Sequence, residues 1–127
     1  MTEYYSDPVN SPFWEGASNR ELRVQRCGTC QHHQHYGRPF CLACSSDDVA
    51  WVRISGIGTV YSVTTVRMQI DPSMEPPYQV ALVDLEEGPR LMSGIVGAEV
   101  KIGDRVHVSW RDRENEPPLY VFQLAED

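Results

Sequence analysis

The chain has 127 residues, and all four of its cysteines lie in one short stretch, as the pairs Cys27/Cys30 and Cys41/Cys44. Each Cys-x-x-Cys pair turns two thiolates toward one point, and two pairs supply the four soft ligands of a tetrahedral structural zinc site. We therefore predict a Zn²⁺ site at these four residues. Two disulfides are the alternative, but they need an oxidising compartment, which nothing in the sequence indicates.

Three histidines, His32, His33 and His35, lie in the loop between the two cysteine pairs. Histidine is a common zinc ligand, but four thiolates already fill the coordination shell, so we expect these histidines to be solvent-facing loop residues. A catalytic zinc needs an open coordination position, which four cysteines do not leave. The predicted metal is therefore structural, and its binding supplies folding energy to a unit too small to bury much apolar surface.

The charge balance argues against a nucleic-acid partner. Eighteen acidic residues against eleven basic ones give a formal net charge of −7, whereas proteins that neutralise phosphates usually carry a basic excess. The first residues show no basic head followed by an apolar run, and no apolar stretch approaches the length of a membrane span. We expect a cytoplasmic protein that works without a membrane, and a reducing cytosol favours metal binding by paired cysteines.

The elements that position the cysteines are predicted to be short. Phe13, Trp14 and Ala17 recur at helical spacing behind Pro12, which predicts a helix near residues 12–19. Residues 22–26 alternate between apolar and polar types, which predicts a strand leading into the first cysteine pair. Each pair would then lie on a short hairpin, and the metal would join the two hairpins into a zinc ribbon.

From residue 51 onward the sequence is rich in β-branched and aromatic residues that alternate with polar ones. The later part predicts about five strands, which fits a small, partly open barrel of the OB type. Gly56 and Gly58 within the first of these strands predict a bulge or a tight bend. The expected fold is mainly β: a short N-terminal helix and four-cysteine zinc ribbon, followed by a five-stranded OB-fold barrel. The predicted divisions are a flexible tail at 1–11, the helix and ribbon at 12–48, and the OB-fold domain at 49–127.

Two further motifs bear on function. Ser55-Gly-Ile-Gly58 lacks the third glycine, the lysine and the following helix of a phosphate-binding loop, so we expect no phosphate there. The aromatic pair Phe13 and Trp14 either packs on its own domain or docks on a partner protein, because Trp and Phe are frequent interface anchors.

The order of these motifs resembles a family of small zinc-ribbon plus OB-fold proteins, formerly catalogued as a domain of unknown function, that accompany thiolase-like acyl-CoA enzymes. The resemblance covers roughly residues 12–124. Its most specific parts are the run Pro12-Phe-Trp-Glu-Gly16, the cysteine spacing and the segment 55–62. Gln31 departs from the pattern, since glycine is usual after the second cysteine of a metal knuckle.

The resemblance implies a non-catalytic accessory subunit of a thiolase-like aldolase or acyltransferase complex, in a hetero-oligomer. The favoured reaction is carbon–carbon bond cleavage, such as a retro-aldol step in steroid or lipid side-chain degradation. The ribbon would help dock the partner, with Phe13 and Trp14 as candidates, and the barrel would help form the coenzyme A channel. The coenzyme A thioester of the partner's substrate is the implied ligand, and Arg53, Arg67 and Arg90 are candidates by elimination for its phosphates.

Two other functions stay open at this point. An OB fold often binds single-stranded nucleic acid on aromatic platforms, for which Tyr61, Tyr78 and Tyr120 are available, although aromatic residues on strands are more often core. Iron in the same four thiolates, as in rubredoxin, would make the chain an electron carrier. The colour of the purified protein distinguishes these metals, because ferric thiolate is red and zinc thiolate is colourless.

Overall fold

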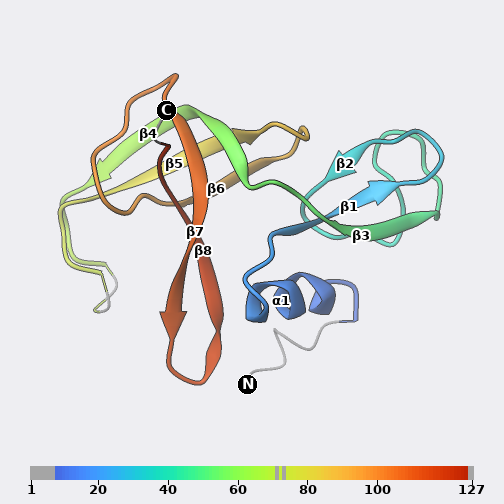
Figure 1. Cartoon of the computed structure of the whole chain (residues 1–127), viewed down its shortest axis with the longest axis horizontal. Coiled ribbons are helices and arrows are strands. Elements are labelled where there is room, and N and C mark those ends of the chain that lie inside the picture. The colour runs from blue at the N-terminus through green and yellow to red at the C-terminus, as the bar shows by residue number, and fades with distance from the viewer. Residues whose placement is uncertain (1–7, 71, 73, 126–127) are drawn as a thin grey trace.

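The computed structural model describes residues 8–70, 72 and 74–125, which form two β-sheets and a short helix (Figure 1). The elements, in chain order, are α1 (Ser11–Ser18), β1 (Arg23–Cys27), β2 (His33–Gln34), β3 (Val49–Arg53), β4 (Ile57–Val66), β5 (Tyr78–Leu85), β6 (Arg90–Gly94), β7 (Arg105–Arg113) and β8 (Glu116–Leu124). Among these residues, no helix has the length and apolar character needed to cross a membrane.

The helix α1 forms close to where the sequence predicts it. A proline in the first turn fits because its missing N–H would have no partner there in any case. The helix ends at Ser18, and Arg20 just after it adopts a φ of 57°. Asn19 and Glu21 donate backbone hydrogen bonds to the carbonyl of Gly16. Its buried face consists of Phe13, Gly16 and Ala17. Through these residues the helix packs against the rest of the chain.

The ribbon is a three-stranded antiparallel sheet in the order β2-β1-β3. Strand β3 pairs along its whole length with β1, from Arg23 opposite Arg53 to Cys27 opposite Val49. The start of the β-rich part of the chain therefore belongs to the sheet of the ribbon. The division of the chain into domains stays a prediction.

The chain passes from the ribbon into the barrel at Gly56. This glycine has a φ of +75°, and a Cβ at this position would lie 2.3 Å from Cγ1 of Val108. Both the backbone conformation and the close approach of β7 therefore require glycine. Ser55, just before it, donates its backbone N–H to Oε2 of Glu87 at 2.9 Å, which ties this crossing to the turn between β5 and β6.

The second sheet has five strands in the order β6-β5-β4-β7-β8 and curls into a nearly closed barrel. Closure comes from a parallel bridge between Ile95 and Phe122, where the N–H of Val96 donates to the carbonyl of Phe122 at 2.9 Å. A register shift between Val60 and Ser62 interrupts the pairing of β4 with β5. The predicted mainly-β fold, with its short helix, four-cysteine unit and five-stranded OB-type barrel, is confirmed.

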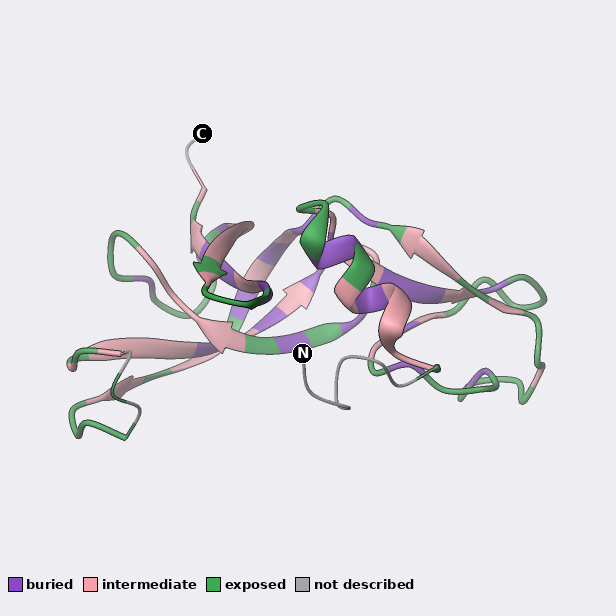
Figure 2. Ribbon diagram, turned by 90° about the horizontal axis from the view of Figure 1, so that it is seen from below, coloured by how far each residue is buried: buried purple, intermediate pink, exposed green. Residues whose placement is uncertain are grey.

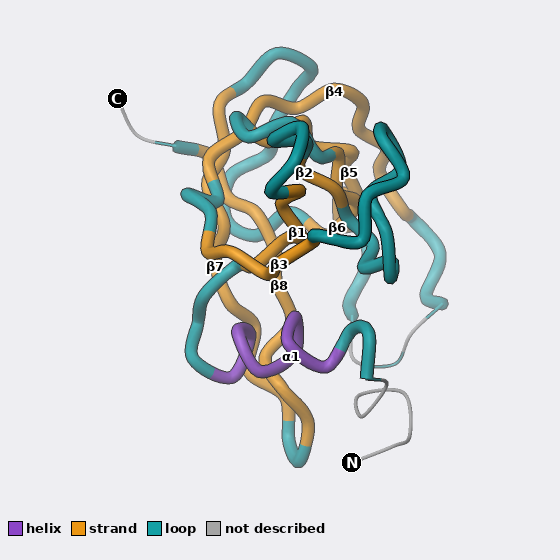
Figure 3. The backbone as a smooth tube through the Cα atoms, turned by 90° about the vertical axis from the view of Figure 1, so that its right-hand side faces the viewer, coloured by secondary structure: helices purple, strands orange, loops and turns teal. Residues whose placement is uncertain are grey.

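One hydrophobic core joins the ribbon, the helix and the barrel. Phe13 from α1 and Val24 from β1 belong to the same cluster as Val83, Val106 and Phe122 of the barrel. In the view coloured by burial the buried segments run from α1 into the strands (Figure 2), and the tube view shows α1 beside the β7–β8 hairpin (Figure 3). The metal-binding unit is therefore packed on the barrel through apolar side chains.

Candidate metal centre and its surroundings

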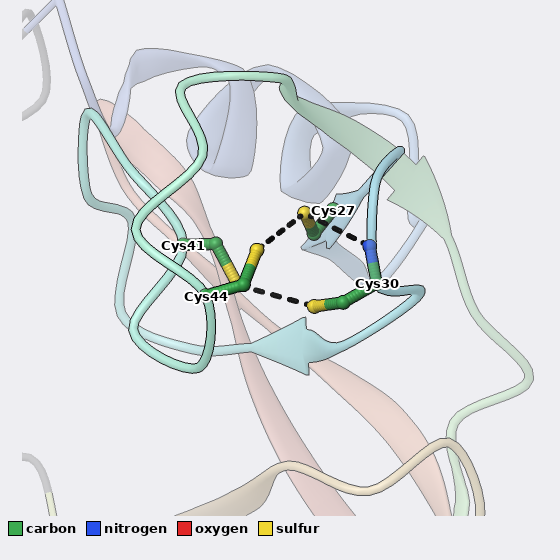
Figure 4. Close-up of side chains that lie close together, drawn as sticks. All are labelled: Cys27, Cys30, Cys41 and Cys44. Carbon is green, nitrogen blue, oxygen red and sulfur yellow. Dashed lines mark hydrogen bonds between the residues drawn. The ribbon is translucent and has the colours of Figure 1, made fainter.

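The four cysteines come together in the ribbon, with their side chains turned toward one another (Figure 4). Their sulfur atoms all lie within 4.8 Å of one another, and Cys27–Cys44 and Cys30–Cys41 are each separated by 3.6 Å. Four thiolates about 2.3 Å from a tetrahedral zinc would lie about 3.8 Å apart. The sulfur positions therefore fit a structural zinc ion, in agreement with the prediction from the cysteine spacing.

Backbone N–H groups surround the ligand sulfurs. Thr29 donates to Sγ of Cys27 and Ala43 donates to Sγ of Cys41, both at 3.3 Å. These hydrogen bonds favour the thiolate, and in the metal-free protein the pKa of Cys27 is lowered to about 6, mainly by the N–H of Cys30. The backbone donors therefore favour negative charge on the sulfur of Cys27.

The two metal knuckles have the same backbone geometry. Gln31 has a φ of 69° and donates its N–H to the carbonyl of Cys27, while Ser45 has a φ of 67° and donates to the carbonyl of Cys41. Glycine is favoured in this left-handed conformation, which explains why its absence at residue 31 is a departure from the family pattern. The substitution leaves the ligand arrangement intact.

The histidines of the intervening loop are not part of the sulfur cluster. Among the described residues, the group able to hold a metal consists of the four cysteines alone. His32 is exposed, while His33 and His35 are half-buried, so the expectation of solvent-facing residues is correct only for His32. Burial lowers the pKa of His35 to about 4, and its buried Nδ1 has no hydrogen-bond partner.

A pair of buried glutamines holds the loop that carries the second knuckle. The side chain of Gln25 bonds both backbone groups of Arg38, its amide donating to the carbonyl and its oxygen accepting the N–H, each at 2.8 Å. Gln34 donates to the carbonyl of Phe40 at 3.1 Å and accepts the N–H of Leu42 at 2.9 Å. Sequence reasoning missed this network, because nothing in the residue type distinguishes these glutamines from surface ones.

The three candidate arginines lie apart. Arg90 donates to Oδ1 of Asp84 at 2.6 Å, at one end of β5, and its guanidinium lies 3.5 Å from the ring centroid of Tyr61. Arg67 follows β4 at the opposite end of β5, which is six residues or roughly 20 Å away. Arg53 belongs to the ribbon sheet. The structure does not bring the three together, and a coenzyme A contact at any of them stays a prediction.

The two aromatic residues of α1 differ in burial. Phe13 is 4% exposed, with its ring centroid 5.1 Å from that of Trp14 and 5.7 Å from that of Tyr120. Phe13 therefore packs on its own domain, which was one of the two alternatives. Trp14 is half-buried and lines a pocket of about 490 Å³ between α1, the ribbon loop and β8. Docking by this pair stays a prediction.

Two other sequence motifs have structural roles. The backbone N–H of Ser55 is already bonded to a carboxylate, which is the wrong environment for a phosphate. Of the three tyrosines considered as base platforms, Tyr61 lies under the guanidinium of Arg90 and Tyr120 packs edge-on against Phe122. These contacts give Tyr61 and Tyr120 roles in the packing of the chain itself.

Fold and metal site together define the class: a four-cysteine zinc ribbon fused to a small OB barrel. The sequence matches two family profiles, described as "ChsH2, rubredoxin-like zinc ribbon domain" over residues 14–50 and "ChsH2, C-terminal OB-fold domain" over residues 51–111. The chain belongs to the ChsH2 family, whose members also carry the family name DUF35.

The similar proteins extend this family assignment. The chain is 38% identical over 120 residues to a "Probable enoyl-CoA hydratase alpha subunit" of Thermomonospora curvata, covering 91% of this chain and 38% of that protein. It is 34% identical over 105 residues to the "3-oxo-4,17-pregnadiene-20-carboxyl-CoA hydratase alpha subunit" of Mycobacterium tuberculosis, covering 79% and 33%. The chain therefore spans about a third of the length of these curated relatives.

Three further comparisons cover most of both chains. A "DUF35 domain-containing scaffold protein" of Methanothermobacter thermautotrophicus is 30% identical, with 75% of each chain covered. The structure titled "Ltp2-ChsH2(DUF35) aldolase" contains a chain 36% identical to this one, with a TM-score of 0.85 and coverage of 93% and 95%. A DUF35 protein from Sulfolobus solfataricus has a TM-score of 0.67 at 18% identity, which supports the fold alone.

Proposed function

We propose that this chain is a non-catalytic accessory subunit of a thiolase-like enzyme that acts on acyl-CoA substrates. The observation that carries the proposal is the similarity to the chain of the Ltp2-ChsH2(DUF35) aldolase, because the match extends over nearly the whole of both chains. The favoured reaction of the complex is a retro-aldol cleavage of a carbon–carbon bond in a steroid or lipid side chain. The zinc ion stabilises the ribbon, and the reacting groups belong to the partner.

The relatives named as hydratase alpha subunits support an acyl-CoA setting and a multi-subunit assembly. Their names do not transfer hydration to this chain, because about two thirds of each hydratase subunit lies outside the match.

A role for the barrel in a coenzyme A channel is the finer part of the proposal. A mainly apolar pocket of about 370 Å³ lies where β5, β6 and β8 approach one another, with Arg111 at its margin. Such a pocket suits the apolar part of a thioester. Arg53, Arg67 and Arg90 remain the candidates for phosphate contacts, and Arg90 is the least available because Asp84 already binds it.

Co-purification tests the proposal. The tagged chain is expressed together with the genes that lie beside its own, whatever co-elutes is identified, and the eluted complex is assayed for stoichiometry, zinc content and cleavage of acyl-CoA. We expect a stoichiometric complex with one zinc ion per accessory chain, and an enzyme that loses activity when this chain is omitted. A chain that elutes alone and retains single-stranded nucleic acid would overturn the proposal in favour of an OB-fold nucleic-acid binder.

A further inference from the structure

The loop between the two metal knuckles exposes a row of large side chains. Gly37 and Cys41 are buried. Pro39 is exposed, and so are the four larger side chains of Tyr36, Arg38, Phe40 and Leu42. Three of these are apolar or aromatic, and their exposed fractions are 61% for Tyr36, 44% for Phe40 and 56% for Leu42. We call the set Tyr36, Arg38, Phe40 and Leu42 the loop surface.

The backbone beneath the loop surface is held at several points. Gln25 binds both backbone groups of Arg38, and Gln34 binds the carbonyl of Phe40 and the N–H of Leu42. Cys41, between these last two residues, is one of the four metal ligands. The loop is therefore fixed by side-chain hydrogen bonds and by the metal site.

Tight packing at Gly37 fixes the other end of the loop. A Cβ on this glycine would lie 2.7 Å from Oδ1 of Asn10 and 2.7 Å from Cζ2 of Trp51. The N–H of Gly37 also donates to Oδ1 of Asn10 at 3.1 Å. The chain entering α1 and the strand β3 thus both support the loop surface from below.

A rigid loop that presents apolar side chains to water needs a physical reason. Exposed apolar residues contribute little to the stability of the free chain, and clusters of them commonly mark interaction sites. Because the side chains are already held in place, a partner would bind them without the entropic cost of ordering a flexible loop. The exposed apolar side chains of this loop are therefore better explained by the binding of a partner than by a contribution to the stability of the fold.

A pocket, which we call the socket, lies directly beside the loop surface. The pocket of about 490 Å³ has walls formed by Phe13, Trp14, His35, Tyr36, Arg38 and Tyr120. Tyr36 and Arg38 thus belong both to the loop surface and to the pocket. Concave, aromatic-lined pockets bordered by apolar residues are where interface anchor residues usually insert.

The charge of Arg38 indicates what the partner must offer. Seven other basic residues form ion pairs with carboxylates of the chain. In the part of the chain that the structure describes, Arg38 forms none, and its guanidinium donates one hydrogen bond, a long one of 3.4 Å to the carbonyl of Gly37. In a chain with a net charge of −7, this arginine is available for a carboxylate from outside.

We propose that the loop surface and its socket form the docking site for the partner enzyme, which inserts an apolar side chain into the socket and places a carboxylate against Arg38. This inference rests on the proposed function and names the surface through which the complex forms. Trp14 and the buried Phe13 both contribute to the walls of the socket.

The test measures binding of the purified partner enzyme to variants of the full chain. Phe40→Ser/Leu42→Ser removes the apolar contacts, and Arg38→Glu reverses the charge. Ile102→Ser, which changes a residue 68% exposed on the barrel, and Lys101→Glu, at a residue paired with Asp104, are the matched controls. Zinc content and circular dichroism establish that each variant is folded. We expect at least tenfold weaker binding for both loop variants and less than a twofold change for the controls.

The outcomes separate the inference from the function on which it rests. If the wild-type chain binds no enzyme, the proposed function is wrong, and the proposed docking site then has no partner enzyme. If the wild-type chain binds and the loop variants bind equally well, the function stands and the docking site is wrong. A wild-type homodimer that Phe40→Ser/Leu42→Ser converts to a monomer, in sedimentation without the enzyme, would also overturn the inference, since the surface would then serve a second copy of the chain.

Discussion

Nε2 of Gln34 donates a hydrogen bond to Oε1 of Gln25 at 2.9 Å, between two side chains that are 4% and 3% exposed. The two residues are also directly opposite each other in the pairing of β1 with β2. Through this contact a single amide pair connects the strand that ends at Cys27 with the loop that leads into Cys41. Metal binding and loop position are therefore coupled by hydrogen bonds as well as by sulfur ligands.

The first prediction follows from that contact. Gln34→Met keeps the shape of the side chain but leaves the carbonyl of Phe40 and the N–H of Leu42 without their buried partner. Each unsatisfied group costs about 1–3 kcal/mol, so we expect the free energy of unfolding to fall by about 2–4 kcal/mol. Urea denaturation with zinc present measures this loss, and Gln123→Met on β8 is the control. An unchanged midpoint would mean that water replaces the lost contacts.

The second prediction concerns the metal. Cys41→Ser removes a ligand whose side chain is fully buried, and we expect loss of stoichiometric zinc and of the ordered ribbon. Because Trp51 lies on β3, its fluorescence should shift toward that of an exposed indole. Ser45→Ala, in the same knuckle, should keep the zinc. Retention of tightly bound zinc by Cys41→Ser would contradict the four-thiolate site.

The third prediction separates two reasons why a position requires glycine: a positive φ, and a lack of space for a Cβ. Gly56→Ala combines an unfavourable positive φ with a steric clash against Val108, whereas Gly97→Ala has a similar φ of +78° and no atom within 4 Å of the new Cβ. We expect about 1 kcal/mol of destabilisation at residue 97 and distinctly more at residue 56. Thermal unfolding of both variants measures the difference. Val108→Ala should rescue part of the extra loss at residue 56, and equal effects at the two glycines would exclude the clash.

The fourth prediction distinguishes a core residue from a surface one on neighbouring elements. Phe13→Ala should destabilise the isolated chain by about 3–5 kcal/mol, because it leaves a cavity in the shared core. Phe40→Ala, at a residue that is 44% exposed, should change the stability by less than about 0.5 kcal/mol. Denaturant titration without the partner compares the two. A stable Phe13→Ala variant would show that the packing of α1 contributes little to the fold.

The fifth prediction is a pH dependence. The pKa of His35 is lowered to about 4 by burial, from an ordinary value of 6.5, so the folded state resists a proton that the unfolded chain accepts. The resulting stability is fully present above pH 6.5 and is lost progressively as the pH falls toward 4, by up to about 3 kcal/mol. Comparing His35→Phe with the wild type isolates this effect from acid release of the metal. Parallel pH profiles for the two proteins would argue against a buried neutral imidazole.

Much of the fold follows from local sequence signals. The zinc site is defined by two Cys-x-x-Cys pairs, since knuckle geometry is local and four soft ligands leave few alternatives. Likewise the helix needs only a proline and an apolar spacing, and the barrel strands need only their β-branched alternation. These features depend on neighbours along the chain, so the sequence by itself determined them.

The tertiary structure decided what depends on partners far apart in the chain. It placed β3 in the ribbon sheet, buried Phe13 in a core shared with Phe122, and separated Arg67 from Arg90 along β5. It also placed Gln25 and Gln34 where their side chains hydrogen-bond the backbone of an exposed apolar loop. Such relationships are set by long-range packing and hydrogen bonding, which residue type and spacing do not encode. The metal site was therefore predictable from the sequence, and the surface beside it became visible only in the folded chain.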